Sequence, residues 1–324
     1  MDKSQIEALI QKLPTLKKEI GKVIVGQSTV IDQLIIGMIA GGHVLLEGVP
    51  GLAKTLMIRS LSEVVGVSFN RIQFTPDLMP TDILGTELLE EDDEGKRHFR
   101  FVKGPVFTNI LLADEINRTP PKTQSALLQV MQEYQVTYGG QRHELPRPFF
   151  LLATQNPIEQ SGTFPLPEAQ VDRFLLYVQV GYPSEAEEAQ ILRVTTSDRS
   201  ETLRPILEAS DIMNLQDLCR QVTIADELVT AINRLVRSTR PAPSASTMVG
   251  KYIDWGAGPR AGQALILAAK ACALLQGRYA VIPSDIRDMS FPALRHRLLL
   301  NYQANADGIS TEDIIQTLLD KVNL

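Results

Sequence analysis

Between residues 43 and 180, short apolar runs alternate with amphipathic helical patterns, which is typical of a parallel α/β sheet. Each run is almost continuously apolar or β-prone, as expected of central strands covered on both faces. The runs are His43–Glu47, Ser68–Phe74, Ile110–Ala113, Phe149–Thr154 and Leu175–Val180. Apolar residues at helical spacing predict helices in two of the gaps, at Lys54–Val65 and Pro121–Glu133. The pattern therefore predicts a five-stranded parallel sheet.

Two segments interrupt this alternation, and both are predicted to be inserted β-hairpins. The first, Glu87–Lys103, separates the second and third strands and carries a run of acids at its tip, residues 90–94. The second, Gln135–Arg147, has Gly139 and Gly140 at its turn, where a tight hairpin needs positive φ angles. A minimal sheet-and-helix fold requires neither hairpin.

Strand signals end at Pro183, and helix-start signals follow. They are Ser184 with Glu187, Asp226, Pro259, Ser284, and Ser310 with Asp313. At 324 residues the chain exceeds what one compact core usually serves. We therefore expect an α/β domain at residues 1–183, with an N-terminal helical segment at 1–24, and an all-α domain at 184–324. The proline-rich stretch 240–246 is interpreted as a loop inside the second domain.

Composition argues against several partners. The chain has 32 basic and 38 acidic side chains, so no overall field attracts nucleic acid or anionic lipid. Two cysteines, Cys219 and Cys272, are too few for a zinc cluster or a disulfide framework, and the four histidines lack metal-ligand spacing. The longest apolar stretch, Ala264–Leu275, is too short to span a bilayer. We expect a soluble cytoplasmic protein without direct membrane insertion.

The segment from Gly48 to Thr55 follows an apolar strand and precedes an amphipathic helix, which is the setting of a phosphate-binding P-loop. In such a loop, backbone N–H groups surround the β-phosphate, Lys54 reaches the β- and γ-phosphates, and the Thr55 hydroxyl binds Mg²⁺. Ala53 departs from the usual pattern, which has glycine before the lysine. We expect the loop to tolerate this alanine because residue 53 would have helical dihedral angles. The predicted phosphate-binding residues are Gly48, Val49, Pro50, Gly51, Leu52, Ala53, Lys54, Thr55 and Leu56.

Polar side chains follow two further predicted strands. Asp114 and Glu115 end the strand that begins at Ile110, at the edge where ligands bind in α/β sheets. Asp114 would hold the Mg²⁺ shell, and Glu115 would orient or deprotonate the attacking water. Asn156 follows the next strand and could position that water without repelling an anion. Taken alone, Asn156-Pro157 is better explained as ordinary turn chemistry.

In this order the elements resemble the AAA+ superfamily, and longer phrases resemble its MoxR branch. The phrases are Gln73–Gly85, Ala113–Arg118, Ala153–Pro157 and Leu166–Phe174, and the resemblance continues through Gly258–Ala261. The two hairpins are similar to those of the helix-2-insert group, which includes magnesium chelatase motor subunits and replicative helicase rings. The resemblance implies a P-loop NTPase AAA+ core with a five-stranded parallel sheet, two inserted β-hairpins and a C-terminal all-α lid domain.

The same resemblance implies roles for residues outside the P-loop. Asn156 matches the sensor of the γ-phosphate, and Arg260 matches the second sensor, at the start of a lid helix. Whether Arg260 would act in its own or a neighbouring site stays open. Gly26 and Gln27, ahead of the first strand, match the segment that packs on adenine.

Two arginines are implied to act between subunits. Arg173 matches the arginine finger, which a neighbouring subunit inserts to neutralise charge on the transferring phosphoryl group. Without the resemblance, a weak surface pair with Asp172 would be the better interpretation. Arg118 is a candidate interface residue, although a solvated arginine explains it equally well.

The resemblance implies ATP and Mg²⁺ as cofactors, ATP hydrolysis in a homo-oligomeric ring, expected to be a hexamer, and remodelling of client proteins. Proteins bearing von Willebrand factor A domains are candidate clients. The alternative is a nucleic-acid motor of the same group, whose hairpins should present basic and aromatic side chains. The first tip is acidic, and the second, Tyr138–Arg142, has one aromatic and one basic residue. We therefore expect no nucleic-acid partner.

Two other classes fit less well. A GTP switch would need an Asn-Lys-x-Asp segment to read guanine, which the chain lacks. A non-hydrolysing ATP-binding module would be expected to have lost Glu115 or Arg173, and both are present.

Overall fold

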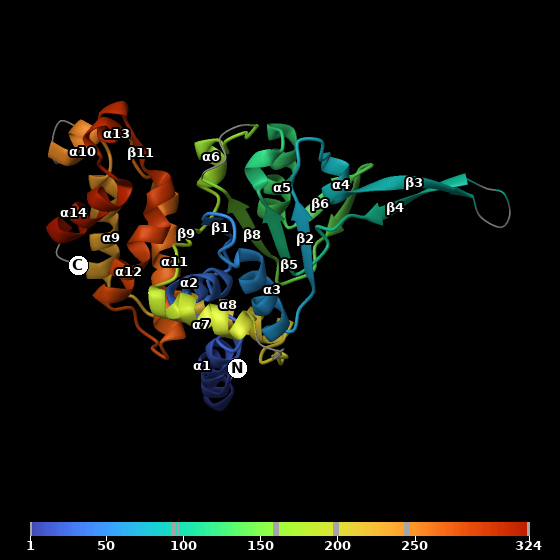
Figure 1. The fold of residues 1–324 in the computed structure, drawn as a ribbon, viewed down its shortest axis with the longest axis horizontal. Helices are drawn as coiled ribbons and strands as arrows, with labels where there is room; N and C mark the ends of the chain where they lie inside the picture. Colours follow the sequence, from blue (N-terminus) through green and yellow to red (C-terminus); the bar gives the residue numbers. More distant parts are fainter. Residues whose placement is uncertain are drawn as a thin grey trace.

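A computed structural model of the chain describes residues 2–91, 95, 97–157, 162–196, 201–242 and 247–322. Figure 1 shows a central α/β part with a long hairpin projecting from one side and a mainly helical C-terminal part packed against the other. The N-terminal helices α1 (Lys3–Ile20) and α2 (Ser28–Ile39) lie beneath the central part.

In the described part of the chain, five strands form one parallel sheet in the order β2-β5-β8-β1-β9. The strands are β1 (Val44–Glu47), β2 (Phe69–Gln73), β5 (Ile110–Asp114), β8 (Phe150–Gln155) and β9 (Leu176–Gln179). The predicted sheet is confirmed, strand for strand. Its central strands are apolar on both sides because both faces are covered, and every residue of β5 is buried.

Successive residues of each strand pack alternately into two separate hydrophobic cores. Val44 and Leu46 belong to a core that includes α1, α2, α3 (Lys54–Val64) and the C-terminal helices, whereas Leu45 faces α5 (Pro121–Glu133). The short helices α4 (Pro80–Leu84), η1 (Ile116–Arg118) and α6 (Glu168–Val171) complete this part of the chain. The sheet thus has the P-loop helix on one face and α5 on the other (Figure 1).

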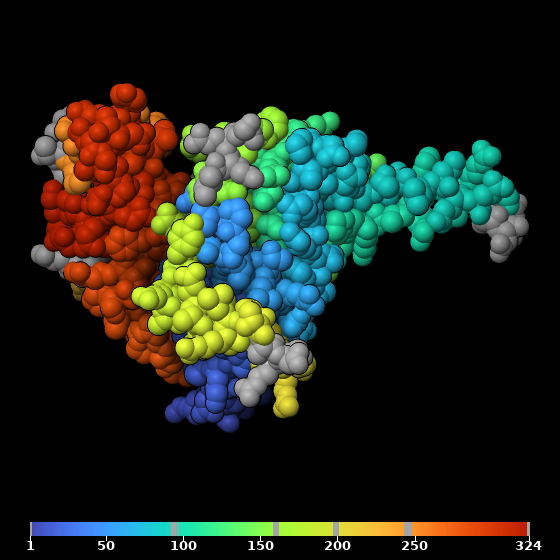
Figure 2. Space-filling view, viewed as in Figure 1, coloured from blue at the N-terminus to red at the C-terminus, as the bar shows by residue number. Residues whose placement is uncertain are grey.

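Both predicted hairpins are confirmed. They are β3 (Gly85–Glu91) with β4 (Arg97–Lys103), and β6 (Gln135–Tyr138) with β7 (Gln141–Glu144). The β3–β4 hairpin projects far beyond the rest of the surface (Figure 2), and its facing pair Leu89 and Phe99 is exposed. Residues 92–94 of the predicted acidic tip lie outside the described residues.

The chain after residue 183 is mainly helical, with the predicted N-cap Ser184 hydrogen-bonded to the backbone N–H of Glu187. The helices are α7 (Glu185–Thr195), α8 (Ala209–Gln221), α9 (Asp226–Ser238), α10 (Thr247–Tyr252), α11 (Pro259–Leu275), α12 (Pro283–Leu294), η2 (Arg295–Arg297), α13 (Tyr302–Asp307) and α14 (Thr311–Val322). Residues 243–246 of the predicted proline-rich loop lie outside the described residues. The division at residue 183 stays a prediction, because one apolar core continues from the sheet into α8 and α11.

The expectation of an all-α second domain is wrong at one place. β10 (Ile253–Trp255) pairs antiparallel with β11 (Leu299–Leu300). Runs this short carry no periodic signal, so the sequence pattern could not reveal them. None of the helices in the described ranges combines the length and the apolar character that a membrane-spanning segment requires.

His43, at the start of β1, is buried and uses both ring nitrogens. Its Nε2 donates to the carbonyl of Met131 at 3.0 Å, and its Nδ1 accepts from the backbone N–H of Leu151 at 3.0 Å. Burial lowers the pKa of His43 to about 4, and the Met131 carbonyl partly opposes that shift. A proton on Nδ1 would also remove the acceptor for Leu151, so the folded protein keeps this ring neutral.

We predict that this neutral histidine makes the fold sensitive to acid. Below pH ~6.5 the unfolded chain protonates His43 but the folded chain does not until about pH 4, so stability falls as the pH falls through that window. His43→Gln can imitate both hydrogen bonds without titrating. Between about pH 7.5 and about pH 5, wild type should lose ~2 kcal/mol more unfolding free energy than this variant in urea titrations. The exposed His98→Gln variant serves as control, and equal pH slopes for wild type and His43→Gln would contradict the prediction.

Candidate functional site

The P-loop connects the carboxyl end of β1 to the first turn of α3. A Cβ at Gly48 would lie 2.9 Å from the carbonyl oxygen of Val180 and 3.0 Å from its Cβ, so this position has room only for glycine. At position 51 the backbone conformation favours glycine, because the φ of +85° is one that L-residues rarely adopt. Position 48 is therefore restricted to glycine by lack of space, and position 51 by its backbone conformation.

Ala53 is left-handed, with φ 54° and ψ 23°. The expectation that residue 53 has helical dihedrals is therefore wrong, because the loop reverses its hand immediately before α3 begins. For alanine this conformation costs about 1 kcal/mol relative to the right-handed region. The usual glycine would avoid that strain, so the loop keeps its form against a local preference.

Lys54 folds back across the loop, and its Nζ donates to the carbonyl of Gly48. Burial lowers the pKa of the Lys54 amine, while the carboxylates of Asp114, Glu115 and Glu47 act in the opposite direction. The amine therefore lies inside the loop, among carboxylates, where it can meet an anion.

Asp114, at the carboxyl end of β5, contacts side chains of β2, β8 and α3. Its Oδ1 accepts from the Thr154 hydroxyl at 2.5 Å, and its Oδ2 lies 3.5 Å from the Thr55 hydroxyl. Arg71 on β2 also reaches Oδ2, with Nε at 3.0 Å and Nη2 at 2.7 Å. Sequence reasoning missed Arg71, because a single charged residue inside a β-prone run has no distinguishing pattern.

Glu115 follows in a left-handed conformation, with φ 58°. Its backbone N–H donates to the Thr154 hydroxyl at 2.9 Å, so one side chain on β8 holds both acids. Its carboxylate accepts from Gln73 Nε2 at 2.9 Å and pairs with Arg118 Nε at 2.9 Å. The structure therefore places Arg118 on the acidic pair of its own chain.

These residues fit a magnesium–nucleotide complex. The hydroxyl of Thr55 and the carboxylate of Asp114 face each other, and both offer the hard oxygen atoms that Mg²⁺ prefers. In the described ranges, no group of three or more His, Cys, Asp or Glu side chains could hold a metal by itself. A metal here would take its remaining ligands from phosphate and water, as Mg²⁺ commonly does.

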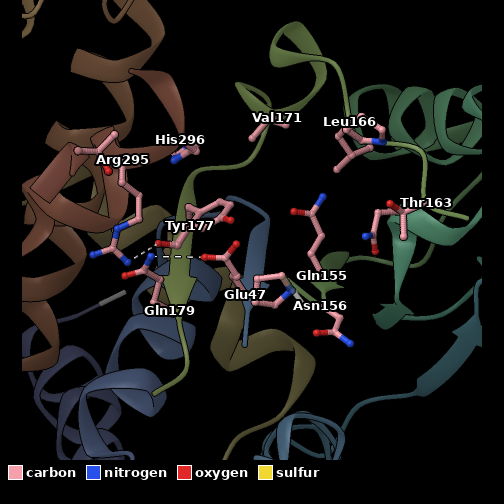
Figure 3. A pocket seen from close by; sticks show the side chains of 14 residues that line it. Glu47, Gln155, Asn156, Thr163, Leu166, Val171, Tyr177, Gln179, Arg295 and His296 are labelled. Atoms are coloured by element: carbon pink, nitrogen blue, oxygen red, sulfur yellow. Dashed lines mark hydrogen bonds between the residues drawn. The ribbon is translucent and has the colours of Figure 1, made fainter. Parts of the chain in front are cut away.

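Asn156 is buried at the end of β8 and lines a cavity of about 610 Å³ on the α5 side of the sheet. Figure 3 shows Glu47 and Gln155 reaching toward this cavity from the sheet, and Arg295 and His296 approaching from η2. Asn156 thus stands at the same sheet edge as the P-loop and Asp114.

Gly26 and Gln27 precede α2 and both have positive φ, 69° and 55°. The Gln27 Nε2 donates to the carbonyl of Gly181 at 2.8 Å, just beyond the end of β9. The segment therefore lies at the carboxyl edge too, beside the first residues after the sheet.

Arg173 and Arg260 lie at the opposite edge. Both line a cavity of about 280 Å³ together with Gly42 and His43, which directly precede β1. Because the strands are parallel, residues before β1 lie at the amino edge and the P-loop after it lies at the carboxyl edge. Four residues of β1 separate the two edges by about 13 Å. The structure therefore does not bring either arginine to the P-loop of its own chain.

Arg173 and the neighbouring Asp172, which could form a surface ion pair, each contact other residues. Arg173 Nη1 donates to the carbonyl of Leu128 at 3.1 Å. The Asp172 carboxylate pairs instead with Arg297, at 2.8 Å, and more loosely with Arg260, at 3.7 Å. Asp172 is thus engaged by residues far along the chain.

Comparisons with known proteins cover most of the chain. Residues 43–176 match the ATPase family associated with various cellular activities (AAA), and residues 245–318 match the AAA lid domain. The chain is 45% identical to Chaperone MoxR1 of Mycobacterium tuberculosis over 98% of this chain and 84% of the relative. It is 31% identical to Protein MoxR of Paracoccus denitrificans over 86% of each protein. A crystal structure of a protein from Cytophaga hutchinsonii matches with a TM-score of 0.90 and 44% identity, over 98% of this chain and 97% of that chain.

We predict that Ala53→Gly stabilises the protein by ~0.5–1 kcal/mol, because glycine adopts the left-handed conformation of residue 53 without strain. Unfolding in urea measures the effect. The control is Ala306→Gly in α13, an exposed helical position where the same change should destabilise by ~0.5–1 kcal/mol. Equal destabilisation by both changes would mean that residue 53 is not left-handed in solution.

Proposed function

Because the chain belongs to the MoxR family of AAA+ ATPases, we propose that it hydrolyses ATP with Mg²⁺ in a ring of its own subunits, a hexamer, to remodel client proteins. The observation that carries this proposal is the separation of the P-loop from Arg173 and Arg260. A site that needs both parts is completed only when the amino edge of one subunit meets the carboxyl edge of the next. A closed ring of head-to-tail contacts provides that arrangement at every interface.

Each subunit supplies the phosphate-binding half of its own site. The P-loop backbone and Lys54 bind the phosphates, while Thr55 and Asp114 hold the metal. Bound Mg²⁺ would supply charge neutralisation on the β- and γ-phosphates. Arg71 shares Asp114 Oδ2 and would have to yield part of that contact.

The water-handling groups are Glu115 and Asn156. Gln73 and Arg118 hold the Glu115 carboxylate, which can orient water and accept its proton. The neutral amide of Asn156 can approach the γ-phosphate without charge repulsion. Gly26 and Gln27 would pack on adenine at the same edge.

The neighbouring subunit supplies the cationic half. Arg173 acts as the arginine finger, and Arg260, which shares its cavity, acts in the neighbour's site rather than in its own. Their guanidinium groups would neutralise charge that develops on the transferring phosphoryl group.

Client remodelling is proposed to take place in the cytoplasm, where ATP is available. The proposal of client remodelling rests on the relative named as a chaperone. Proteins with von Willebrand factor A domains are the proposed clients. The nucleic-acid alternative is not favoured by the β3–β4 hairpin. The two arginines of this hairpin, Arg97 and Arg100, are neutralised by ion pairs with Glu91 and Glu90.

We predict that Lys54→Ala and Glu115→Gln each lower Mg²⁺-dependent ATP hydrolysis by at least ~10²-fold, because each removes a contact to the transition state. Phosphate release measures turnover, and equilibrium titration with ATP measures binding, which Glu115→Gln should retain. The exposed Lys122→Ala and Glu133→Gln variants are matched controls. A wild type without hydrolysis in any oligomeric state would refute the enzymatic proposal.

We predict that Arg173→Ala is nearly inactive by itself but is partly rescued in mixed rings with Lys54→Ala. In equal, random mixtures about a quarter of the interfaces combine an intact P-loop with an intact finger, so activity should approach about a quarter of wild type if sites fire independently. Exposed Arg234→Ala is the control. Near-normal hydrolysis by rings made of Arg173→Ala alone would remove the finger role.

A further inference from the structure

The element η2 of the lid lies along β9, which ends the sheet in the described part of the chain. Its consecutive basic side chains donate to carbonyl oxygens of β9 and the segment before it. Arg295 Nη1 reaches Tyr177 O at 3.1 Å, and His296 Nε2 reaches Phe174 O at 3.1 Å. Arg297 lies farthest toward the amino edge. Side chains of the lid thereby satisfy backbone acceptors that no further strand covers.

Arg297 is unusual in its burial and in the number of its bonds. Its side chain is 3% exposed. It donates to Asp172 Oδ1 at 2.8 Å, Asp172 O at 3.0 Å, Phe174 O at 2.8 Å and Leu175 O at 3.3 Å, and also to Ala293 O. Asp172 and Phe174 are the two neighbours of Arg173 in the chain. One guanidinium group from the lid therefore holds the backbone on both sides of the proposed finger.

Asp172 extends this hold to Arg260. One of its carboxylate oxygens pairs with Arg297 and the other lies 3.7 Å from Arg260 Nη1. Burial lowers the pKa of Arg297, and Asp172 opposes that shift by stabilising the charged form. Removing one partner of such a pair leaves a buried charge and carbonyls without their donor, so the local backbone must rearrange.

We propose that Arg297 is a positioning residue for Arg173 and Arg260, through which the lid of one subunit controls ATP hydrolysis in the neighbour's site and not in its own. This inference rests on the proposed ring function. The contacts of Arg297 lie at the amino edge, across the sheet from the P-loop of the same chain. A shift of the lid would move the finger backbone directly, and a misplacement of about 1 Å in a catalytic group can lower turnover by ~10²-fold.

The test uses Arg297→Gln, which removes the charge and most of the donors. Asp172→Asn is a second, milder variant, because Asp172 is partly exposed and the amide keeps the size of the side chain. Arg278→Gln is the matched control. Arg278 forms a comparable ion pair with the buried Asp285 inside the lid, but its side-chain contacts lie away from residues 172–175. Thermal unfolding of all three variants measures how much each weakens the fold.

We expect Arg297→Gln rings to lose at least ~10-fold in hydrolysis while their affinity for a non-hydrolysable ATP analogue stays at the wild-type value. Asp172→Asn should show a smaller defect of the same kind, and Arg278→Gln should retain turnover. Mixed rings should recover activity when Arg297→Gln is combined with Lys54→Ala, which has intact fingers. They should not recover with Arg173→Ala, because both subunits then lack a working finger.

Three results would overturn the proposal. They are near-normal turnover of Arg297→Gln, loss of analogue affinity together with turnover, and recovery with Arg173→Ala but not with Lys54→Ala. If Arg297→Gln does not fold, the same comparisons on Asp172→Asn decide. If the reference mixture of Lys54→Ala and Arg173→Ala is itself inactive, the proposal is judged by whether Arg297→Gln loses turnover while it keeps its affinity for the analogue. Failure of the ring function would appear separately, as normal hydrolysis by Arg173→Ala alone.

Discussion

The parallel direction of the strands is the constraint on which the rest of this molecule depends. Since every strand of the sheet ends at the same edge, the P-loop, Asp114 and Asn156 meet there although long stretches of chain separate them. The same geometry puts the residues that precede β1 and β9 at the other edge, where Arg173 lies. The P-loop and the two arginines Arg173 and Arg260 are thus kept apart within one subunit. Assembly is the proposed means of combining them.

Tertiary contacts hold the carboxyl edge in backbone conformations that its residues do not adopt by local preference. Gln27, Ala53 and Glu115 are all left-handed although none is glycine. Such residues persist only where the surroundings determine the backbone, and here Thr154 binds both Asp114 and the N–H of Glu115. The strain is located at the edge where the proposed nucleotide site requires backbone N–H groups and acids to face a ligand.

The lid contributes to this architecture through the edge of the sheet. A strand that ends a sheet presents backbone groups to solvent, and here η2 covers part of that edge with Arg295, His296 and Arg297. These residues extend between the two edges that carry the proposed halves of the site. Arg295 lines the cavity that also contains Glu47, next to the P-loop, whereas Arg297 holds the segment that carries Arg173. The short element η2 thereby contacts residues near the P-loop as well as the segment that carries Arg173.

The sequence by itself determined the sheet, both hairpins, the P-loop helix and the positions of the acids, because each depends on local periodicity or on a few adjacent residues. Continuous apolar runs indicated the buried strands, and Gly139-Gly140 indicated a turn. Only the tertiary structure decided the left-handed Ala53, the ion pair of Arg71 with Asp114, the β10–β11 pair and the contacts of Arg297 with the segment that carries Arg173. Arg71 and Asp114 are 43 residues apart, and Arg297 and Asp172 are 125 apart. Local sequence patterns do not indicate such pairs, because packing of the whole chain brings the two residues together.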